Sequence, residues 1–327
     1  MRNHNLGWLV KLLIGVLVFI TPLVIVFAVT RIWPRALAEE QLPAVPATDP
    51  ALVKYHEAHT IPTGFSEPRA IALGSDGALY AAGDLEIVRL RESGERTRII
   101  ALTAPPCCLA VDAEGLFYIG LKDHVEVYDS HGRLQSRWTI PGKSAYFTSI
   151  AISGNTVWVA DAGSRLVWKY DRTGKLMTSI GRKDQRTGAP GFVVPSPHMD
   201  VAVARDGTLW VSNPGRHALE NFTGDSSLRR TWGTTGNTVA AFSGCCNPTD
   251  FALLPDGRFV TAEKKLPRVK IYRADGTFDG FVAGSESFAA KIEGMDLAVG
   301  AHGQVFVLDT ERKSVRVFEP NVEKMHE

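Results

Sequence analysis

The chain has 327 residues, of which 45% are apolar and 22% are charged, and its formal net charge is +1. This is the balance of an ordinary globular protein. The absence of a basic excess argues against a nucleic-acid partner.

An apolar segment without a charged residue covers residues 12–30. At about 1.5 Å of rise per residue, a helix over this segment would span the hydrocarbon core of a bilayer. Trp8 and Trp33 flank it, where interfacial aromatic residues sit. The segment predicts an N-terminal tail and transmembrane signal anchor over residues 1–35. The alternative is a signal peptide that is cleaved at Ala38, after a small-residue motif.

Residues 36–52 are rich in Pro and Ala and show no periodicity, which is typical of an extended linker. A short tail before a large domain favours the tail inside and the domain outside. We therefore expect a single-pass protein of a cell inner membrane, held by residues 12–30. Its globular domain is expected on the periplasmic or extracellular side. Residues 321–327 are predicted to form a C-terminal tail.

A short sequence motif recurs along the rest of the chain, at intervals of about 40–50 residues. It reads apolar residue, Ala, apolar residue, then a turn that usually carries Gly, then an apolar or aromatic strand. The copies begin with Ile71–Leu73, Leu109–Val111, Ile150–Ile152, Val201–Val203, Phe251–Leu253 and Leu297–Val299. Each copy continues with an alternating third strand, and a turn and a fourth strand such as 134–140 follow. Four short strands per repeat predict one blade of a β-propeller.

Two details favour a closed ring over a β-helix, which is the alternative fold. The Ala recurs in the first strand of every copy, where a small side chain is needed as strands crowd around an axis. The last copy has only three strands before the chain ends near Pro320, and residues 53–61 can supply the missing fourth strand. We therefore predict an all-β, six-bladed β-propeller over residues 53–320.

These repeats resemble those of the NHL-repeat six-bladed propellers, here in a membrane-anchored, bacterial-type form. The resemblance lies in the first two strands, in phrases such as 159–170 and 307–318, and in the long loops 181–197 and 232–248. It covers about residues 53–320. It implies the fold and says little about function, because the family includes binding, scaffolding and catalytic members.

Acidic residues and one amide recur at the strand ends that should surround the mouth of the channel. Asp200, Asp250 and Asp296 precede first strands, whereas Asn213 and Glu263 close second strands. One interpretation is that the carboxylates accept hydrogen bonds from backbone amides of neighbouring blades. The other is a site for a cation or polar ligand, in which Asn213, Asp250 and Asp296 would be the oxygen ligands of a metal.

The cysteines occur as two adjacent pairs, Cys107–Cys108 and Cys245–Cys246, which lead into the second and fifth copies. His198 leads into the fourth copy, so the same mouth is expected to gather soft ligands. Three interpretations remain open: strained disulfides within each pair, a copper, zinc or iron–sulfur site, or inert free thiols. A bond across the channel requires Cα atoms within about 7 Å.

The anchor and the absence of a catalytic motif favour a non-enzymatic module that binds a small molecule or a protein at its channel mouth. The expected ligand-binding residues are Cys107, Cys108, His198, Asp200, Asn213, Cys245, Cys246, Asp250, Glu263 and Asp296. One alternative is a hydrolase, since Glu67, Asn213 and Asp250 or Asp296 resemble the divalent-ion ligands of lactonase-type propellers, with Ca or Zn expected. The Gly usual between that family's Glu and Pro is missing here. The other alternative is a metal or redox protein that uses the cysteine pairs.

Overall fold

The computed structural model describes residues 47–139, 144–183, 191–290 and 292–321. The chain divides into two compact units, Met1–Pro46 and Ala47–Glu327. The predicted tail and anchor over residues 1–35 lie outside the described residues, as does the linker up to residue 46. No helix within the described ranges is both long and apolar enough to cross a bilayer.

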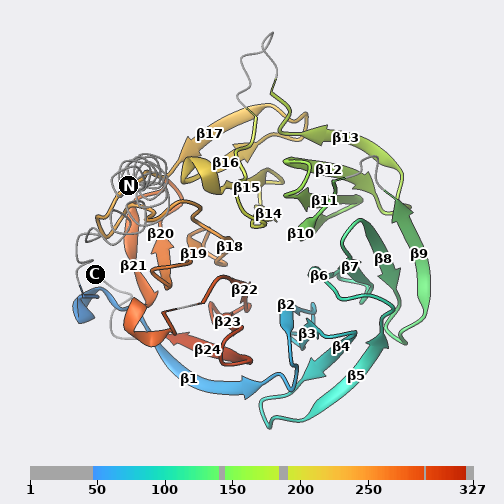
Figure 1. Cartoon of the computed structure of the whole chain (residues 1–327), viewed down its shortest axis with the longest axis horizontal. Coiled ribbons are helices and arrows are strands. Elements are labelled where there is room, and N and C mark those ends of the chain that lie inside the picture. Colours follow the sequence, from blue (N-terminus) through green and yellow to red (C-terminus); the bar gives the residue numbers. More distant parts are fainter. Residues whose placement is uncertain (1–46, 140–143, 184–190, 291, 322–327) are drawn as a thin grey trace, which may run out of the picture. The chain divides into compact units, whose positions relative to one another are not determined.

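The second unit contains six antiparallel sheets of four strands each, which we call blades 1 to 6 (Figure 1). Blade 1 contains β2 (Pro68–Leu73), β3 (Leu79–Gly83), β4 (Glu86–Leu90) and β5 (Arg96–Ala101). Blade 2 contains β6 (Cys108–Val111), β7 (Phe117–Gly120), β8 (His124–Tyr128) and β9 (Leu134–Thr139). Blade 3 contains β10 (Phe147–Ser153), β11 (Thr156–Asp161), β12 (Leu166–Asp171) and β13 (Leu176–Ile180).

The second half of the chain repeats this pattern. Blade 4 contains β14 (Val201–Val203), β15 (Leu209–Asn213), β16 (Ala218–Phe222) and β17 (Leu228–Trp232). Blade 5 contains β18 (Asp250–Leu253), β19 (Phe259–Glu263), β20 (Arg268–Tyr272) and β21 (Phe278–Ala283). Blade 6 contains β22 (Met295–Val299), β23 (Val305–Asp309), β24 (Ser314–Pro320) and β1 (Tyr55–Pro62). The 3₁₀ turns are η2 (Pro50–Leu52), η3 (Pro214–Arg216) and η4 (Ser285–Ser287).

The ring closes where the sequence predicted it. Strand β1 pairs antiparallel with β24, with Tyr55 opposite Pro320 and Pro62 opposite Ser314. The Arg316 guanidinium on β24 binds the Glu57 carboxylate on β1 through Nε at 3.0 Å and through a second nitrogen at 2.5 Å. The first strand thus completes the last blade, and the six-bladed all-β propeller is confirmed.

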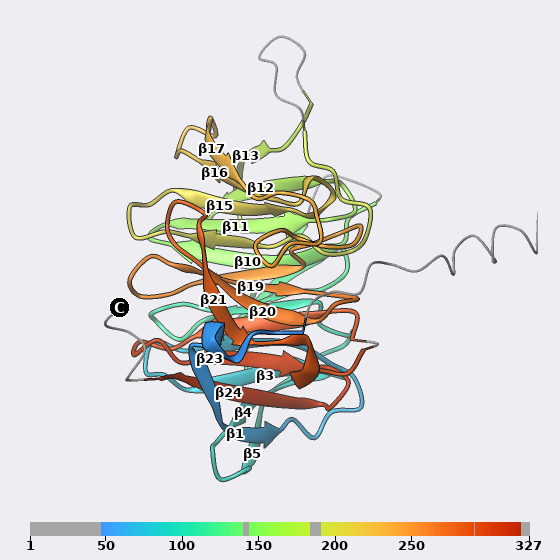
Figure 2. The same ribbon diagram turned by 90° about the vertical axis from the view of Figure 1, so that its left-hand side faces the viewer.

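The innermost strands of neighbouring blades contact one another around the whole ring: β2, β6, β10, β14, β18 and β22. Figure 2 shows the same ring of blades from the side. The recurring Ala lies on these strands, and it is buried in blades 1 and 3 and half-buried in the others. A larger side chain at this position would push adjacent blades apart.

The core lies between blades, where aromatic side chains of one blade pack against the next. Trp232 of blade 4 lies 4.9 Å from the Tyr272 ring and 5.0 Å from the Phe259 ring of blade 5, between ring centroids. It also lies under the turn at Gly276, where a Cβ would meet the indole Cγ at 2.6 Å. Trp138 of blade 2 lies in the same way under the turn at Gly174 of blade 3, where a Cβ would meet the indole Cδ1 at 2.3 Å. Both glycines have positive φ, so the close approach and the turn require the same residue type.

Candidate functional site

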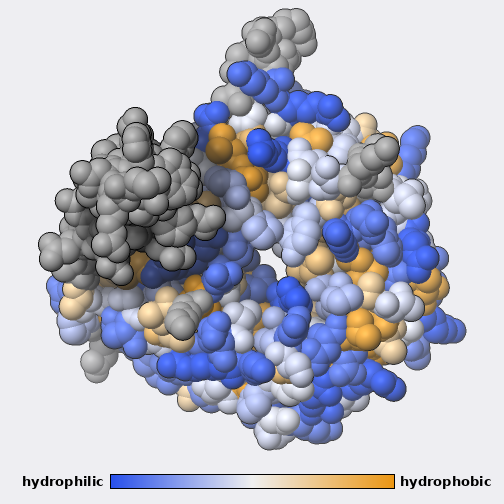
Figure 3. Space-filling view, viewed as in Figure 1, coloured by the Kyte–Doolittle hydropathy of each residue, from blue (hydrophilic) through white to orange (hydrophobic). Residues whose placement is uncertain are grey.

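A cavity of about 680 Å³ lies at the end of the channel where the innermost strands begin. Viewed along the axis of the ring, Figure 3 shows an opening at the centre. The residues around it are mostly coloured white to blue, from intermediate to hydrophilic. The cavity is lined by Asp250 and Asp296 at strand starts, by His198 and Cys107 from loops, and by the Glu67 and Arg69 side chains of blade 1. Its size falls within the usual range for small-molecule sites, about 300–1,000 Å³.

The three aspartates that precede first strands link each blade to the next. Asp200 accepts a hydrogen bond from the Phe251 N–H at 2.8 Å. Asp250 accepts one from the Leu297 N–H at 3.2 Å, and Asp296 accepts one from the Ile71 N–H at 2.6 Å. The predicted bonds to neighbouring backbone amides are therefore present. These bonds do not exclude ligand binding, because Asp250 and Asp296 also line the cavity.

The same three carboxyls carry raised pKa values. Burial raises the pKa of Asp200 to about 6 and that of Asp296 to about 7. Burial raises the pKa of Asp250 well above its ordinary value, and the neighbouring carboxylates Asp200 and Asp296 add to the effect. The carboxyls of Asp250 and Asp296 hydrogen-bond to each other. A proton shared between the Asp250 and Asp296 carboxyls accounts for the raised pKa values of the pair.

His198 adds a neutral imidazole to the cavity wall. Burial, assisted by the charge of Lys264, lowers its pKa to about 4. Gly294 lies close to the ring, since a Cβ at this position would meet Cε1 at 3.0 Å. At neutral pH this side chain can donate and accept one hydrogen bond each.

Asn213 and Glu263 lie elsewhere, although the sequence placed them at the mouth. The Asn213 side chain accepts the Val193 N–H at 2.9 Å and donates to Glu220 at 2.8 Å. Glu263 is fully buried and binds Arg268 at 3.0 Å and Lys270 at 2.7 Å. Neither side chain is among those that line the cavity.

Residues that close second strands share this clamping role. Asp161 accepts the Tyr146 N–H at 2.9 Å, and Glu263 accepts the Ser243 N–H at 3.1 Å. Each therefore fixes the loop that leads into its own blade, as Asn213 does for the loop before β14. A polar residue at the end of a second strand therefore fixes the loop before its blade. The sequence alone did not distinguish this structural role from ligand binding.

All four cysteines are free thiols in the structure, which does not support the disulfide interpretation. In the first pair, Cys107 lines the cavity, whereas the Cys108 sulfur is buried against Gly120, where a Cβ would meet it at 2.3 Å. Adjacent residues entering a strand point to opposite sides, so these two sulfurs are kept apart. Burial raises the pKa of both thiols.

The second pair lies outside the cavity lining. Cys245 is exposed, Cys246 is buried, and their sulfurs are 3.3 Å apart, joined by a hydrogen bond and not by a disulfide. The predicted gathering of both pairs with His198 around one opening therefore does not occur, and only Cys107 joins it.

Sequence reasoning missed several lining residues. Tyr146 and Thr148 come from the loop and first strand of blade 3, and Glu293 and Glu311 come from loops of blade 6. Tyr146, Thr148 and Glu293 lie just before or at the start of a first strand, and Glu311 lies in the loop after a second strand. Their positions next to the repeated motif are the signal that could have found them. In the part of the chain that the structure describes, no cluster of three or more His, Cys, Asp or Glu side chains is suited to hold a metal ion. Of the residues that resemble the lactonase-type ligands, Glu67, Asp250 and Asp296 line the cavity, with Glu67 paired to Arg69 at 2.5 Å, whereas Asn213 is not among the lining residues.

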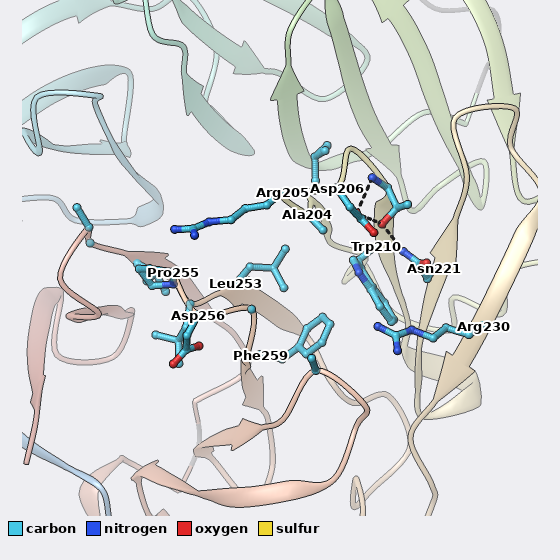
Figure 4. A pocket seen from close by; sticks show the side chains of 18 residues that line it. Ala204, Arg205, Asp206, Trp210, Asn221, Arg230, Leu253, Pro255, Asp256 and Phe259 are labelled. Carbon is cyan, nitrogen blue, oxygen red and sulfur yellow. Dashed lines mark hydrogen bonds between the residues drawn. The ribbon is translucent and has the colours of Figure 1, made fainter. Parts of the chain in front are cut away.

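A second cavity of about 570 Å³ lies at the other ends of the innermost strands of blades 4, 5 and 6. Figure 4 shows the Arg230 guanidinium beside the Trp210 ring, and the two are 4.8 Å apart. The Asn221 amide is already bound to Thr208 at 2.9 Å, and Trp210 and Phe259 are almost fully buried by the protein. The mouth cavity is lined by more titratable side chains than this second cavity, and we take it as the candidate site.

No protein-family model and no curated protein matches the sequence. Among solved structures, a streptogramin B lyase is similar with a TM-score of 0.59 at 13% identity, over 84% of this chain and 100% of the other. A gluconolactonase from Xanthomonas campestris is similar with a TM-score of 0.59 at 15% identity, over 85% and 99%. The WD40 propeller domain of Doa1 is similar with a TM-score of 0.55 at 15% identity, over 78% and 80%. At these identities the similarities show that the chain has a β-propeller fold, and they carry no activity to it.

Proposed function

We propose that this chain is a binding module whose mouth cavity takes a small, amine-bearing cationic molecule. The proposal rests on the side chains that line the cavity, among which carboxyl groups outnumber basic groups. Glu67, Asp250, Glu293, Asp296 and Glu311 line it, whereas its one lining guanidinium, Arg69, is already paired with Glu67. A cation entering this space would meet carboxyl oxygens on several sides.

The raised carboxyl pKa values make a specific signature for such binding. A bound cation stabilises the ionised form of Asp250 and Asp296, so their pKa values fall and protons leave on binding. The affinity should therefore rise between pH 5.5 and pH 8. A neutral polyol gains nothing from this ionisation, and its affinity should stay flat over the same range.

Calorimetric titration of a panel of alkyl mono-, di- and polyamines, with neutral alcohols of matched size as controls, tests the proposal. We expect at least one amine to bind saturably. Its measured binding heat should change with the ionisation enthalpy of the buffer, because protons released on binding are taken up by the buffer. The Asp250→Asn and Asp296→Asn variants should weaken binding by about tenfold or more each, as expected for the loss of a charged hydrogen-bond partner. Binding of the alcohols alone, or amine binding that both variants retain, would contradict it.

The finer features expected from the sequence belong to the same proposal: an NHL-type repeat, an anchor over residues 12–30 and an extracytoplasmic propeller. The repeats and the uncharged N-terminal segment support them. Carbonate extraction of membranes tests the anchor, because an anchored chain stays in the pellet. An N-terminus beginning after Ala38 in the mature protein would instead show cleavage of a signal peptide.

A hydrolase is a second candidate, and one observation favours it. The neutral His198 imidazole shares the cavity with two carboxyls of raised pKa, which are the group types that perform acid–base catalysis. A screen of lactone and ester substrates, with and without Ca and Zn, tests this candidate. Turnover that His198→Gln abolishes would support it, and the absence of turnover with either ion would remove it.

A further inference from the structure

The pair Cys245–Cys246 forms a preorganised dithiol on the loop that leads into blade 5. The Cys246 thiol points at the Cys245 sulfur, and the two sulfurs are 3.3 Å apart. Cys245 is exposed to solvent, whereas only 3% of Cys246 is exposed. One sulfur can therefore meet an external reagent while the second waits directly behind it.

The surroundings of Cys245 favour its thiolate. The Lys265 ammonium lies 3.6 Å from the sulfur. The hydrogen bond from the Cys246 thiol and the positive charges of Lys265 and Lys264 lower the pKa of Cys245. Since the thiolate is the nucleophile in exchange reactions, the lowered pKa increases the reactive fraction of this sulfur.

The loop that carries the pair is fixed to the blade. The Asn247 amide donates to the Ser243 carbonyl at 2.6 Å and accepts the Lys264 N–H at 2.9 Å. The Ser243 N–H in turn binds the buried Glu263 carboxylate at 3.1 Å. The two sulfurs are thus held near Lys265 by a network that extends into the core of blade 5.

We propose that Cys245 and Cys246 form a thiol–disulfide exchange site, in which Cys245 attacks an external disulfide and Cys246 resolves the product. The Cys245 thiolate attacks one sulfur of a disulfide RSSR, forms a Cys245–S–SR bond and releases RS⁻. Cys246 then loses its proton to solvent, attacks the Cys245 sulfur and expels the second RS⁻. The pair has given two electrons to RSSR, which leaves as two thiols, and the protein holds a Cys245–Cys246 disulfide.

The substrate class follows from the geometry. The attacking sulfur is exposed on a loop beside two lysines. A small disulfide with carboxylates, such as oxidised glutathione, can approach and place its negative groups near Lys264 and Lys265. This site is separate from the mouth cavity and does not depend on the ligand proposed for that cavity.

The chain contains its own control in Cys107–Cys108, which is the same dipeptide in the opposite arrangement. Burial raises the pKa of both of those thiols, and the Cys108 sulfur is buried against Gly120. We expect Cys245 to react with a thiol reagent at least about tenfold faster than Cys107 at pH 7, since one pKa unit already changes the thiolate fraction tenfold. Cys108 should react only after unfolding.

The experiment treats the reduced full chain with oxidised glutathione at pH 7 and follows intact and peptide masses over time. The unsubstituted chain should lose two hydrogens at the Cys245–Cys246 peptide and hold little glutathione. The Cys246→Ser variant should trap one glutathione on Cys245, the Cys245→Ser variant should resist, and Cys107→Ser should behave as the unsubstituted chain. A stable glutathione adduct on the unsubstituted chain, or faster reaction at Cys107, would overturn the proposal. Circular dichroism of each variant confirms that it is folded before its reactivity is compared.

Discussion

Replacing Asp296 by Asn is expected to stabilise the propeller at pH 8 and to leave its stability at pH 4.5 nearly unchanged. Burial raises the pKa of this carboxyl from 3.8 to about 7, so the folded chain keeps a proton that the unfolded chain releases between about pH 4 and pH 7. Stability therefore falls as the pH rises through that window. An amide has no such cost, and its oxygen can still accept the Ile71 N–H.

The pKa change corresponds to about 4 kcal/mol at 1.36 kcal/mol per unit. Because the carboxyl is partly exposed toward the cavity, we expect about half of this, roughly 2 kcal/mol, at pH 8. Urea unfolding followed by tryptophan fluorescence measures it, and the midpoint should move upward by roughly 0.7–1 M.

Asp206→Asn is the matched control for this measurement. Its carboxylate accepts the Thr208 hydroxyl at 2.6 Å and the Thr208 N–H at 3.0 Å, and these hydrogen bonds lower the pKa of Asp206. Its replacement should therefore lower stability at pH 8. If Asp296→Asn lowers the free energy of unfolding at pH 8, or raises it equally at pH 4.5 and pH 8, then ionisation of the buried Asp296 carboxyl does not destabilise the folded chain.

Three further changes test other parts of the structure. Gly276→Ala should lower the free energy of unfolding by about 1–3 kcal/mol more than Gly257→Ala, because both have positive φ but only Gly276 would bring a Cβ against Trp232; equal thermal shifts would show that the contact has no weight. Lys265→Gln should slow alkylation of Cys245 several-fold at pH 7 and little at pH 10, where the thiolate forms without help; an unchanged rate at pH 7 would remove the role of the ammonium. A chain without β1 should fail to unfold cooperatively in a thermal scan, since β24 would keep an unpaired edge, whereas a sharp transition at the original temperature would show that closure is dispensable.

The fold could be predicted because its signals are local and repeated. The Ala of each first strand and the turns at positions such as Gly207 and Gly257 report crowding and backbone conformation, which neighbouring residues determine. The closing strand was predictable from a count of strands, because the last blade lacked one until residues 53–61 were assigned to it.

The site was harder to predict because it depends on side-chain direction at strand ends. The pairing register shifts between Pro68 and Ala70 on β2 and between Phe147 and Ser149 on β10, both at the cavity end. A bulge inserts an extra residue into the strand and so changes which residue faces the channel. The alternation of apolar and polar residues in the sequence then no longer predicts the direction of each side chain. Asn213 was misplaced for a related reason, since its partners Val193 and Glu220 become neighbours only in the folded blade.

The most direct test of the central claim is a carboxyl-selective ¹³C NMR titration of the full chain, with Asp296→Asn to assign the signal. We expect one carboxyl that titrates near pH 7 and is lost in the variant, because burial beside Asp250 raises the pKa of Asp296 to about 7. If the assigned Asp296 signal titrates below pH 5, the mouth cavity holds no shared proton and the proposed proton-linked binding is contradicted.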